Sequence, residues 1–147
     1  MRIFTFPALV LCTLLIACAP QQANLTSSGA NASSSLTQSS IDIVTDMAES
    51  GASLVAKNGP EKVKALAMEA VRGNLKDPAS AQFRNVRLVE FSGGKVVCGE
   101  VNAKNAYGGY VGYTRWVSGG VYAQLYKEVE YEHLERDFNA GLMMACS

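Results

Sequence analysis

Residues Cys98 to Trp116 read CGEVNAKNAYGGYVGYTRW, and the expected fold is built around them. Apolar and polar residues alternate from Lys95 to Ala103, and a second strand-like run follows from Tyr110 to Val117. Period-two alternation bounded by Asn and Gly is typical of a β-hairpin. The connecting residues 104–109 are rich in Asn and Gly, which tolerate a positive φ. The pattern therefore predicts a hairpin with a long, polar loop.

Two further strands flank this hairpin. Arg84–Phe91 and Val121–Tyr131 also alternate, and glycine-containing turns at 92–95 and 118–120 join them to the hairpin. Strands that follow one another through short turns usually pair as neighbours. We therefore expect a four-stranded antiparallel meander.

Helical periodicity appears in three segments, Ile41–Lys57, Glu61–Lys76 and Glu132–Cys146. Each places apolar residues three or four positions apart, as an amphipathic helix requires, although Gly51 weakens the first and Gly141 the last. Asp77 and Pro78 end the second segment and open a short turn. The expected fold class is α+β: N-terminal helices, the meander, and a C-terminal helix disulfide-bonded to the sheet.

The N-terminus is typical of an exported protein. Residues 1–17 read MRIFTFPALVLCTLLIA, an apolar run too short and too interrupted by Pro7 for a transmembrane helix. Leu15 to Cys18 is similar to the lipobox of bacterial lipoprotein precursors, in which the cysteine is acylated and becomes the mature N-terminus. The alternative is cleavage nearby, with Cys18 left as an ordinary thiol. Ala19, where an Asp would favour the inner membrane, favours an outer-membrane anchor.

The segment after the lipobox predicts a linker. Residues 18–40 contain no charged and no aromatic residue, so they offer little apolar surface to offset the entropy of ordering. We expect a lipidated cysteine and a flexible Ser/Asn/Gln-rich tether here, followed by a single α+β domain over 41–147. Within that domain, residues 41–59 are expected to form a peripheral helix.

The four cysteines divide into two groups. Cys12 leaves with the signal and Cys18 takes the lipid, which leaves Cys98 and Cys146 in an oxidising compartment. We expect these two to form a disulfide. A free reactive thiol and a metal ligand are the alternatives, although two cysteines with one distant histidine make a poor zinc site.

One family resemblance follows from these residues. The motif CGEVNAKNAYGGYVGY, together with LKDPASAQF at Leu75 to Phe83 and the final Cys146, resembles a group of small exported domains of bacteria and prophages. The resemblance covers roughly residues 62 to 147. It implies a related fold, brings no catalytic residue with it, and admits a role in altering the cell envelope of a lysogen.

The charge balance and the motifs limit which partners, cofactors and activities the sequence supports. Thirteen basic residues balance thirteen acidic ones, which argues against a nucleic-acid partner. We identify no cofactor motif, no metal site and no catalytic residue. The single histidine, His133, has no recognisable nucleophile. An alternative function is an envelope-polymer hydrolase that uses Glu100 with one of three downstream residues, which are Glu128, Glu130 and His133.

The best candidate for a binding surface is the hairpin itself, whose Tyr and Trp offer contact area and whose Asn and Lys offer hydrogen bonds. Its residues are Asn102, Lys104, Asn105, Tyr107, Tyr110, Tyr113, Arg115 and Trp116. In the competing interpretation the asparagines cap the turn and the tyrosines cover the sheet. We expect a non-enzymatic interaction module, anchored to the membrane by its acyl groups, with an envelope protein or peptidoglycan as partner. A purely structural envelope protein is the remaining alternative.

Overall fold

The computed structural model describes residues 28–147. The predicted signal segment at 1–17, the predicted lipidation site Cys18 and the first part of the predicted tether lie outside the described residues. The described chain consists of α1 Ser28–Asn58, α2 Pro60–Arg72, the 3-10 helix η1 Pro78–Ser80, β1 Gln82–Phe91, β2 Gly94–Asn102, β3 Thr114–Ser118, β4 Ala123–Leu125 and α3 Glu132–Cys146. None of the helices in this part of the chain has both the length and the apolar character that crossing a bilayer requires.

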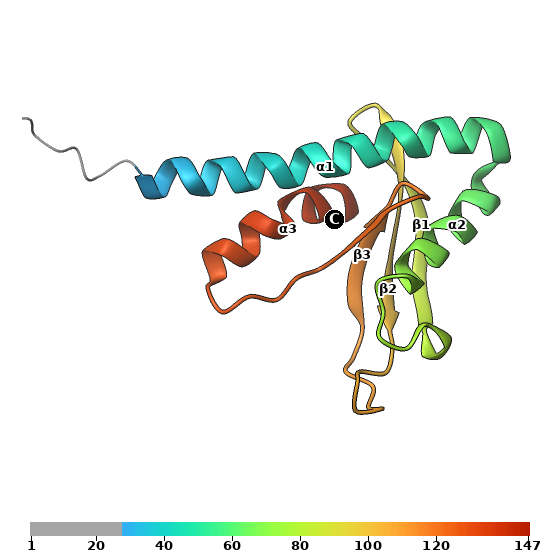
Figure 1. The fold of residues 1–147 in the computed structure, drawn as a ribbon. Coiled ribbons are helices and arrows are strands. Elements are labelled where there is room, and N and C mark those ends of the chain that lie inside the picture. The colour runs from blue at the N-terminus through green and yellow to red at the C-terminus, as the bar shows by residue number, and fades with distance from the viewer. Residues whose placement is uncertain (1–27) are drawn as a thin grey trace, which may run out of the picture.

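The α+β fold class is confirmed. The four strands form one antiparallel sheet in the order β1-β2-β3-β4, which is the predicted meander. A two-residue turn joins β1 to β2, and both of its residues, Ser92 and Gly93, have a positive φ, at 50° and 77°. Turns of this type match the right-handed twist of the paired strands. Figure 1 shows α1 and α3 at one end of the sheet, with the loop between β2 and β3 at the other.

Helices cover both faces of the sheet, and each face has its own core. The first core lies under α1 and α3, and its buried residues are Val44, Met47, Ala48, Val96, Cys98, Val117, Leu142 and Ala145. The second lies under α2, and its buried residues are Val63, Ala67, Val71, Val97, Val101 and Trp116. β2 contributes to both cores, so its residues 96–99 are all buried, and the alternation predicted from Lys95 to Ala103 is wrong for this part of the strand.

The predicted disulfide is confirmed. Cys98 of β2 is bonded to Cys146 at the end of α3, with Cα atoms 5.6 Å apart. Cys98 is fully buried in the first core. The bond therefore ties the closing helix to the middle of the sheet.

The prediction of a tether through residue 40 is wrong for residues 28–40, because α1 begins at Ser28. Ser40 is only 5% exposed, and its Oγ donates to the carbonyl oxygen of Phe138 at 2.9 Å. The Thr37 hydroxyl donates to an oxygen of the Asp137 carboxyl group at 2.7 Å. The α3 surface thus supplies the contacts that the composition of this segment lacks.

The helix predicted as peripheral over 41–59 is central instead. Val44 and Ala48 are fully buried in the first core. Gly51, expected to weaken the helix, lies where α1 passes the backbone of β2, and a Cβ there would overlap the carbonyl oxygen of Lys95. The small residue is required for this close approach.

Two strands are shorter than the sequence predicts. β3 begins at Thr114 instead of Tyr110, and β4 spans only Ala123–Leu125 of the predicted 121–131. The buried side chain of Asn139 in α3 explains the second difference: its Oδ1 accepts from the N–H of Lys127, and its Nδ2 donates to the carbonyl oxygen of Lys127, both at 2.8 Å. These bonds take the place of ladder hydrogen bonds and turn the chain toward the helix.

Candidate functional site

The loop between β2 and β3 is held by its own hydrogen bonds. Lys104 and Tyr110 form an antiparallel bridge at its base. Within the loop, the side-chain oxygen of Asn105 accepts from the N–H of Tyr107 at 2.9 Å and from the N–H of Gly109 at 3.1 Å. Asn105 therefore organises the turn from the inside, which is the capping role of the competing interpretation.

The base of the loop is also fixed to η1. The Ser80 hydroxyl accepts from the N–H of Lys104 at 2.8 Å, and the Tyr110 hydroxyl donates to the carbonyl oxygen of Ser80 at 3.3 Å. Asn102 accepts from the N–H of Gly112 at 3.1 Å. Of the predicted surface residues, Asn102 and Asn105 thus shape the loop rather than present themselves to a partner.

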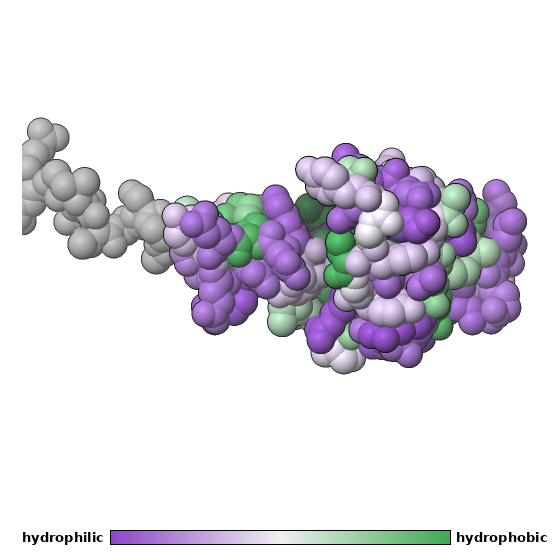
Figure 2. Space-filling model, turned by 90° about the horizontal axis from the view of Figure 1, so that it is seen from below, coloured by the Kyte–Doolittle hydropathy of each residue, from purple (hydrophilic) through white to green (hydrophobic). Residues whose placement is uncertain are grey.

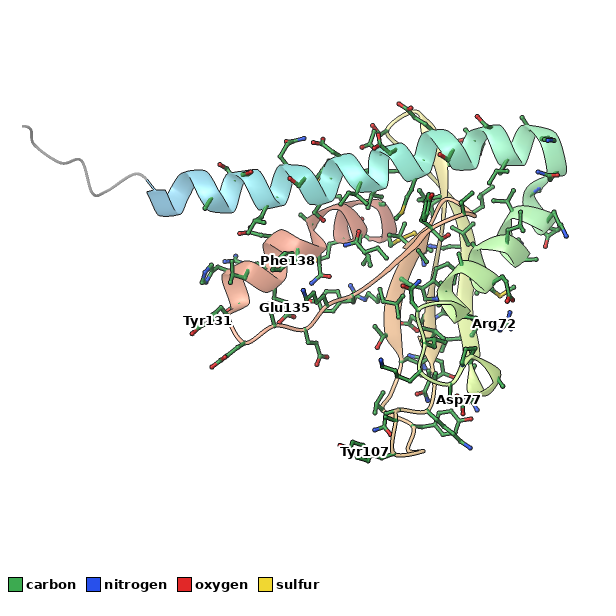
Figure 3. The ribbon with its side chains drawn as sticks, viewed as in Figure 1. Arg72, Asp77, Tyr107, Tyr131, Glu135 and Phe138 are labelled. Carbon is green, nitrogen blue, oxygen red and sulfur yellow. A yellow bond between two sulfur atoms is a disulfide. The ribbon has the colours of Figure 1, made fainter. Side chains whose placement is uncertain are left out.

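The tip of the loop carries the most exposed aromatic side chain. Tyr107 is 98% exposed, and Val111 follows at 69% and Tyr110 at 47%. Figure 3 shows Tyr107 at the outermost point of the loop, away from the helices and from Tyr131. Seen from this end, the surface is mainly hydrophilic with small apolar areas (Figure 2). We call Tyr107 the loop tip, because Tyr110 lies at the base of the loop and Val111 follows it.

Trp116 does not belong to the surface, so its prediction as a contact residue is wrong. Its side chain is fully buried in the second core and packs edge-on against Phe83, with ring centroids 6.0 Å apart. The indole also covers Gly99 of the neighbouring strand. Trp116 follows the exposed Arg115, so the alternation of β3 turns it toward α2.

Arg115, exposed on β3, and Tyr113, the residue just before this strand, lie apart from the loop tip. The Arg84 guanidinium stacks over the Tyr113 ring at 3.7 Å from its centroid and forms a salt bridge with Glu100. β3 pairs with the edge of β2 opposite β1, and there Arg115 is the register partner of Glu100. The predicted surface thus separates into the loop tip, a capped turn, a buried tryptophan and this sheet face.

Glu100 is stabilised as a carboxylate. The hydrogen bond from Arg84, the charges of Arg84 and Arg115, and a 3.1 Å bond from Asn85 hold the pKa of Glu100 below its ordinary value, against the opposing effect of burial. A general acid in glycoside hydrolysis needs a raised pKa, so this environment does not suit Glu100 to that role. A base or nucleophile would remain ionised in the same environment.

None of the other residues of the hydrolase alternative, Glu128, Glu130 and His133, lines the cavity that Glu100 lines. Glu128 lines a neighbouring cavity with Tyr113 and Arg115, whereas His133 is exposed in the first turn of α3, with its ring 6.0 Å from that of Tyr131. Among residues 28–147 no group of three His, Cys, Asp or Glu side chains is placed to hold a metal ion.

Sequence analysis missed three polar residues that share the sheet face with Arg115, which are Arg84, Asn85 and Arg87. The signal that could have found them is the break in alternation between Phe83 and Val86, where two polar residues occur together. Such a break is typical of a β-bulge. Comparisons of the chain with protein-family models, curated proteins and solved structures gave no match.

Proposed function

We propose that this protein is a lipoprotein anchored to the outer membrane, with a periplasmic domain that acts as a non-enzymatic binding module through its loop tip. The anchor rests on the lipobox-like segment that ends at Cys18. An acyl chain contributes membrane affinity of about 0.8 kcal/mol per buried CH₂, so the acylated cysteine would hold the domain at the bilayer surface.

One observation carries the binding role: an almost fully exposed tyrosine stands on a loop that is already ordered. Tyr107 is 98% exposed, while the Asn105 side chain and the Ser80 contacts hold the backbone beneath it. A tyrosine offers a large contact area and a hydroxyl for little loss of side-chain entropy. A preorganised loop avoids part of the ordering cost of binding. The partner we propose is an envelope protein or peptidoglycan.

The test is crosslinking in intact cells, with the full chain at its native level. Tyr107→Ala removes the exposed ring and leaves the Asn105 bonds, which involve only the backbone of residue 107. Tyr131→Ala is the matched control. This tyrosine is also exposed, at 58%, but it lies at the start of α3, away from Tyr107. We expect one crosslinked partner to be lost in Tyr107→Ala and kept in Tyr131→Ala. The same partners in both variants would refute the loop tip as the contact surface.

The anchor needs a separate test, since binding and anchoring are independent. The mature native chain should begin at Cys18 and carry the mass of its acyl groups, and Cys18→Ser should carry no acyl mass. An unmodified Cys18 in the intact mass would exclude lipidation.

A further inference from the structure

A β-bulge places two arginines on the same face of the sheet. Arg84 pairs with Glu100 and Arg87 with Cys98, so β1 takes three steps where β2 takes two. Asn85, which lies in the bulge between Arg84 and Arg87, has a positive φ of 56°, and its side-chain amide donates to the Glu100 carboxylate. Without the bulge, Arg87 would point into the core under α2.

The part of the sheet face that carries these arginines is not covered by a helix. α1 and α3 cover the end of the sheet that holds Val96 and Val117, and α3 ends at Cys146 (Figure 1). Arg87 donates to the carbonyl oxygen of Cys146 at 2.8 Å, so it caps the end of this helix. Beyond this point the face is hollowed instead of packed.

Two cavities on this face have Arg115 in common. The first has a volume of about 280 Å³, and the residues that line it are Asn85, Arg87, Cys98, Gly99, Glu100, Arg115, Cys146 and Ser147. The second, of about 370 Å³, is lined by Tyr113, Thr114, Arg115, Tyr126, Glu128 and Met143. The range for small-molecule sites is roughly 300–1,000 Å³, so the first volume lies just below it and the second at its lower end.

Arg115 is the cation on this face that is available to a ligand. Arg84 is engaged by Glu100 and Tyr113, and one nitrogen of Arg87 is engaged by the end of α3. Within residues 28–147, Arg115 has no salt bridge, although its charge is near enough to Glu100 to help lower the pKa of that carboxyl group. Its guanidinium is exposed and keeps hydrogen-bond donors for a planar acceptor.

The neighbours of Arg115 define the ligand. A guanidinium group binds a carboxylate through two parallel hydrogen bonds. Glu100 and Glu128 line the two cavities on either side of Arg115, so a polyanion would meet repulsion there, whereas sugar hydroxyls would find acceptors. Tyr113, 39% exposed, has Arg84 stacked over one face of its ring, so its other ring face is the aromatic surface on which a sugar ring would stack.

We propose that this sheet face binds a sugar that carries one carboxylate, with Arg115 as the residue that recognises the carboxylate and Glu100 and Glu128 as acceptors for its hydroxyls. This site is distinct from the loop tip and does not depend on the partner proposed for it. A sugar acid within a longer glycan would present the same group.

The test uses the purified full-length chain in detergent and follows the backbone amide signals by NMR. Glucuronate is the probe, and glucose is its uncharged counterpart. We expect saturable shifts at residues 85, 99, 100 and 115 with glucuronate, and an affinity at least about tenfold weaker for glucose. Arg115→Gln should weaken glucuronate binding by about tenfold or more, since a charge-assisted bidentate contact is lost.

Arg136→Gln is the matched control. It removes the same charge from an exposed position on α3 that lines neither cavity, so glucuronate should bind it as it binds the native chain. Equal affinity for glucuronate and glucose, or an unchanged affinity in Arg115→Gln, would overturn the proposal. Equal binding of inorganic phosphate, or of an N-acetylated dipeptide with a free carboxylate, would overturn the assignment to an acidic sugar.

Discussion

The Ser40 hydroxyl of α1 forms two hydrogen bonds with the backbone of α3, at Phe138 and at Gly141. It donates to the carbonyl oxygen of Phe138 at 2.9 Å and accepts from the N–H of Gly141 at 3.1 Å. The carbonyl oxygen of Ser40 occupies the position next to Gly141 where a Cβ would stand. α1 and α3 therefore meet backbone to backbone, and this contact orders the part of α1 that the composition predicts as a tether.

Gly141→Ala should destabilise the protein, although alanine is the better helix former by about 1 kcal/mol. The added methyl group would collide with the Ser40 backbone, and overpacking of this kind costs about 1–3 kcal/mol. Denaturant unfolding measures the loss. Gly73→Ala is the control, because Gly73 has a right-handed φ of −59° and the nearest atom to a Cβ there is 3.4 Å away. Equal stability of the two variants would show that α1 can shift freely over α3.

Removal of the disulfide should cost a large part of the stability. The bond closes a loop with a sequence separation of 48, for which the chain-entropy model gives about 4 kcal/mol. The double variant Cys98→Ala, Cys146→Ala avoids a free thiol in the core. Its unfolding midpoint should fall and become insensitive to reductant, whereas that of the native chain should fall only when reductant is added. An unchanged midpoint would mean that the two cores hold α3 without the bond.

Gly99→Ala should displace the only tryptophan. A Cβ on Gly99 would lie 2.6 Å from Cζ2 and 2.9 Å from Cε2 of Trp116, so the indole would have to move. We expect the emission maximum of Trp116 to shift to the red and stability to fall by about 1–3 kcal/mol. Gly109→Ala, where a Cβ meets only the Asn105 side chain at 3.8 Å, should leave both unchanged. A native-like spectrum for Gly99→Ala would contradict the close packing.

Glu100 should make the stability depend on pH in the acidic range. Its pKa is lowered in the folded protein from an ordinary value of 4.5, chiefly by the hydrogen bond from Arg84. A depressed folded pKa stabilises the protein above the unfolded pKa, and this stabilisation is lost as the pH falls through the folded pKa. The native chain should therefore be more stable than Glu100→Gln at pH 7, and the difference should shrink below about pH 4.5. Parallel stability curves for the two proteins between pH 7 and pH 3 would refute the coupling.

The local patterns of the sequence predicted most element types. The glycine-containing turn within 92–95, the cap at Asp77 and the amphipathic helix over Glu132–Cys146 each depend on residues a few positions apart, and all three are present in the structure. The disulfide could be predicted because only two cysteines remain in the predicted mature domain after Cys12 and Cys18 are set aside.

The candidate site could be predicted only in part. The exposure of Tyr107 follows from its place in a polar turn, but the burial of Trp116 depends on Gly99 and on α2, which lie across the sheet and behind it. Arg87 reaches the face of Arg115 only because β1 contains a bulge opposite β2. Register between strands is not a property of either strand alone.

The sequence by itself thus determined the class of the fold, the order of its elements and the pairing of its cysteines, because periodicity, turn chemistry and cysteine count are local or countable. The tertiary structure decided that α1 begins at Ser28, that the predicted surface separates into a loop tip and a sheet face, and that Arg115 lies between two cavities. Each of these depends on contacts between segments far apart in the chain, whose free energy overrides the local preference of the residues involved.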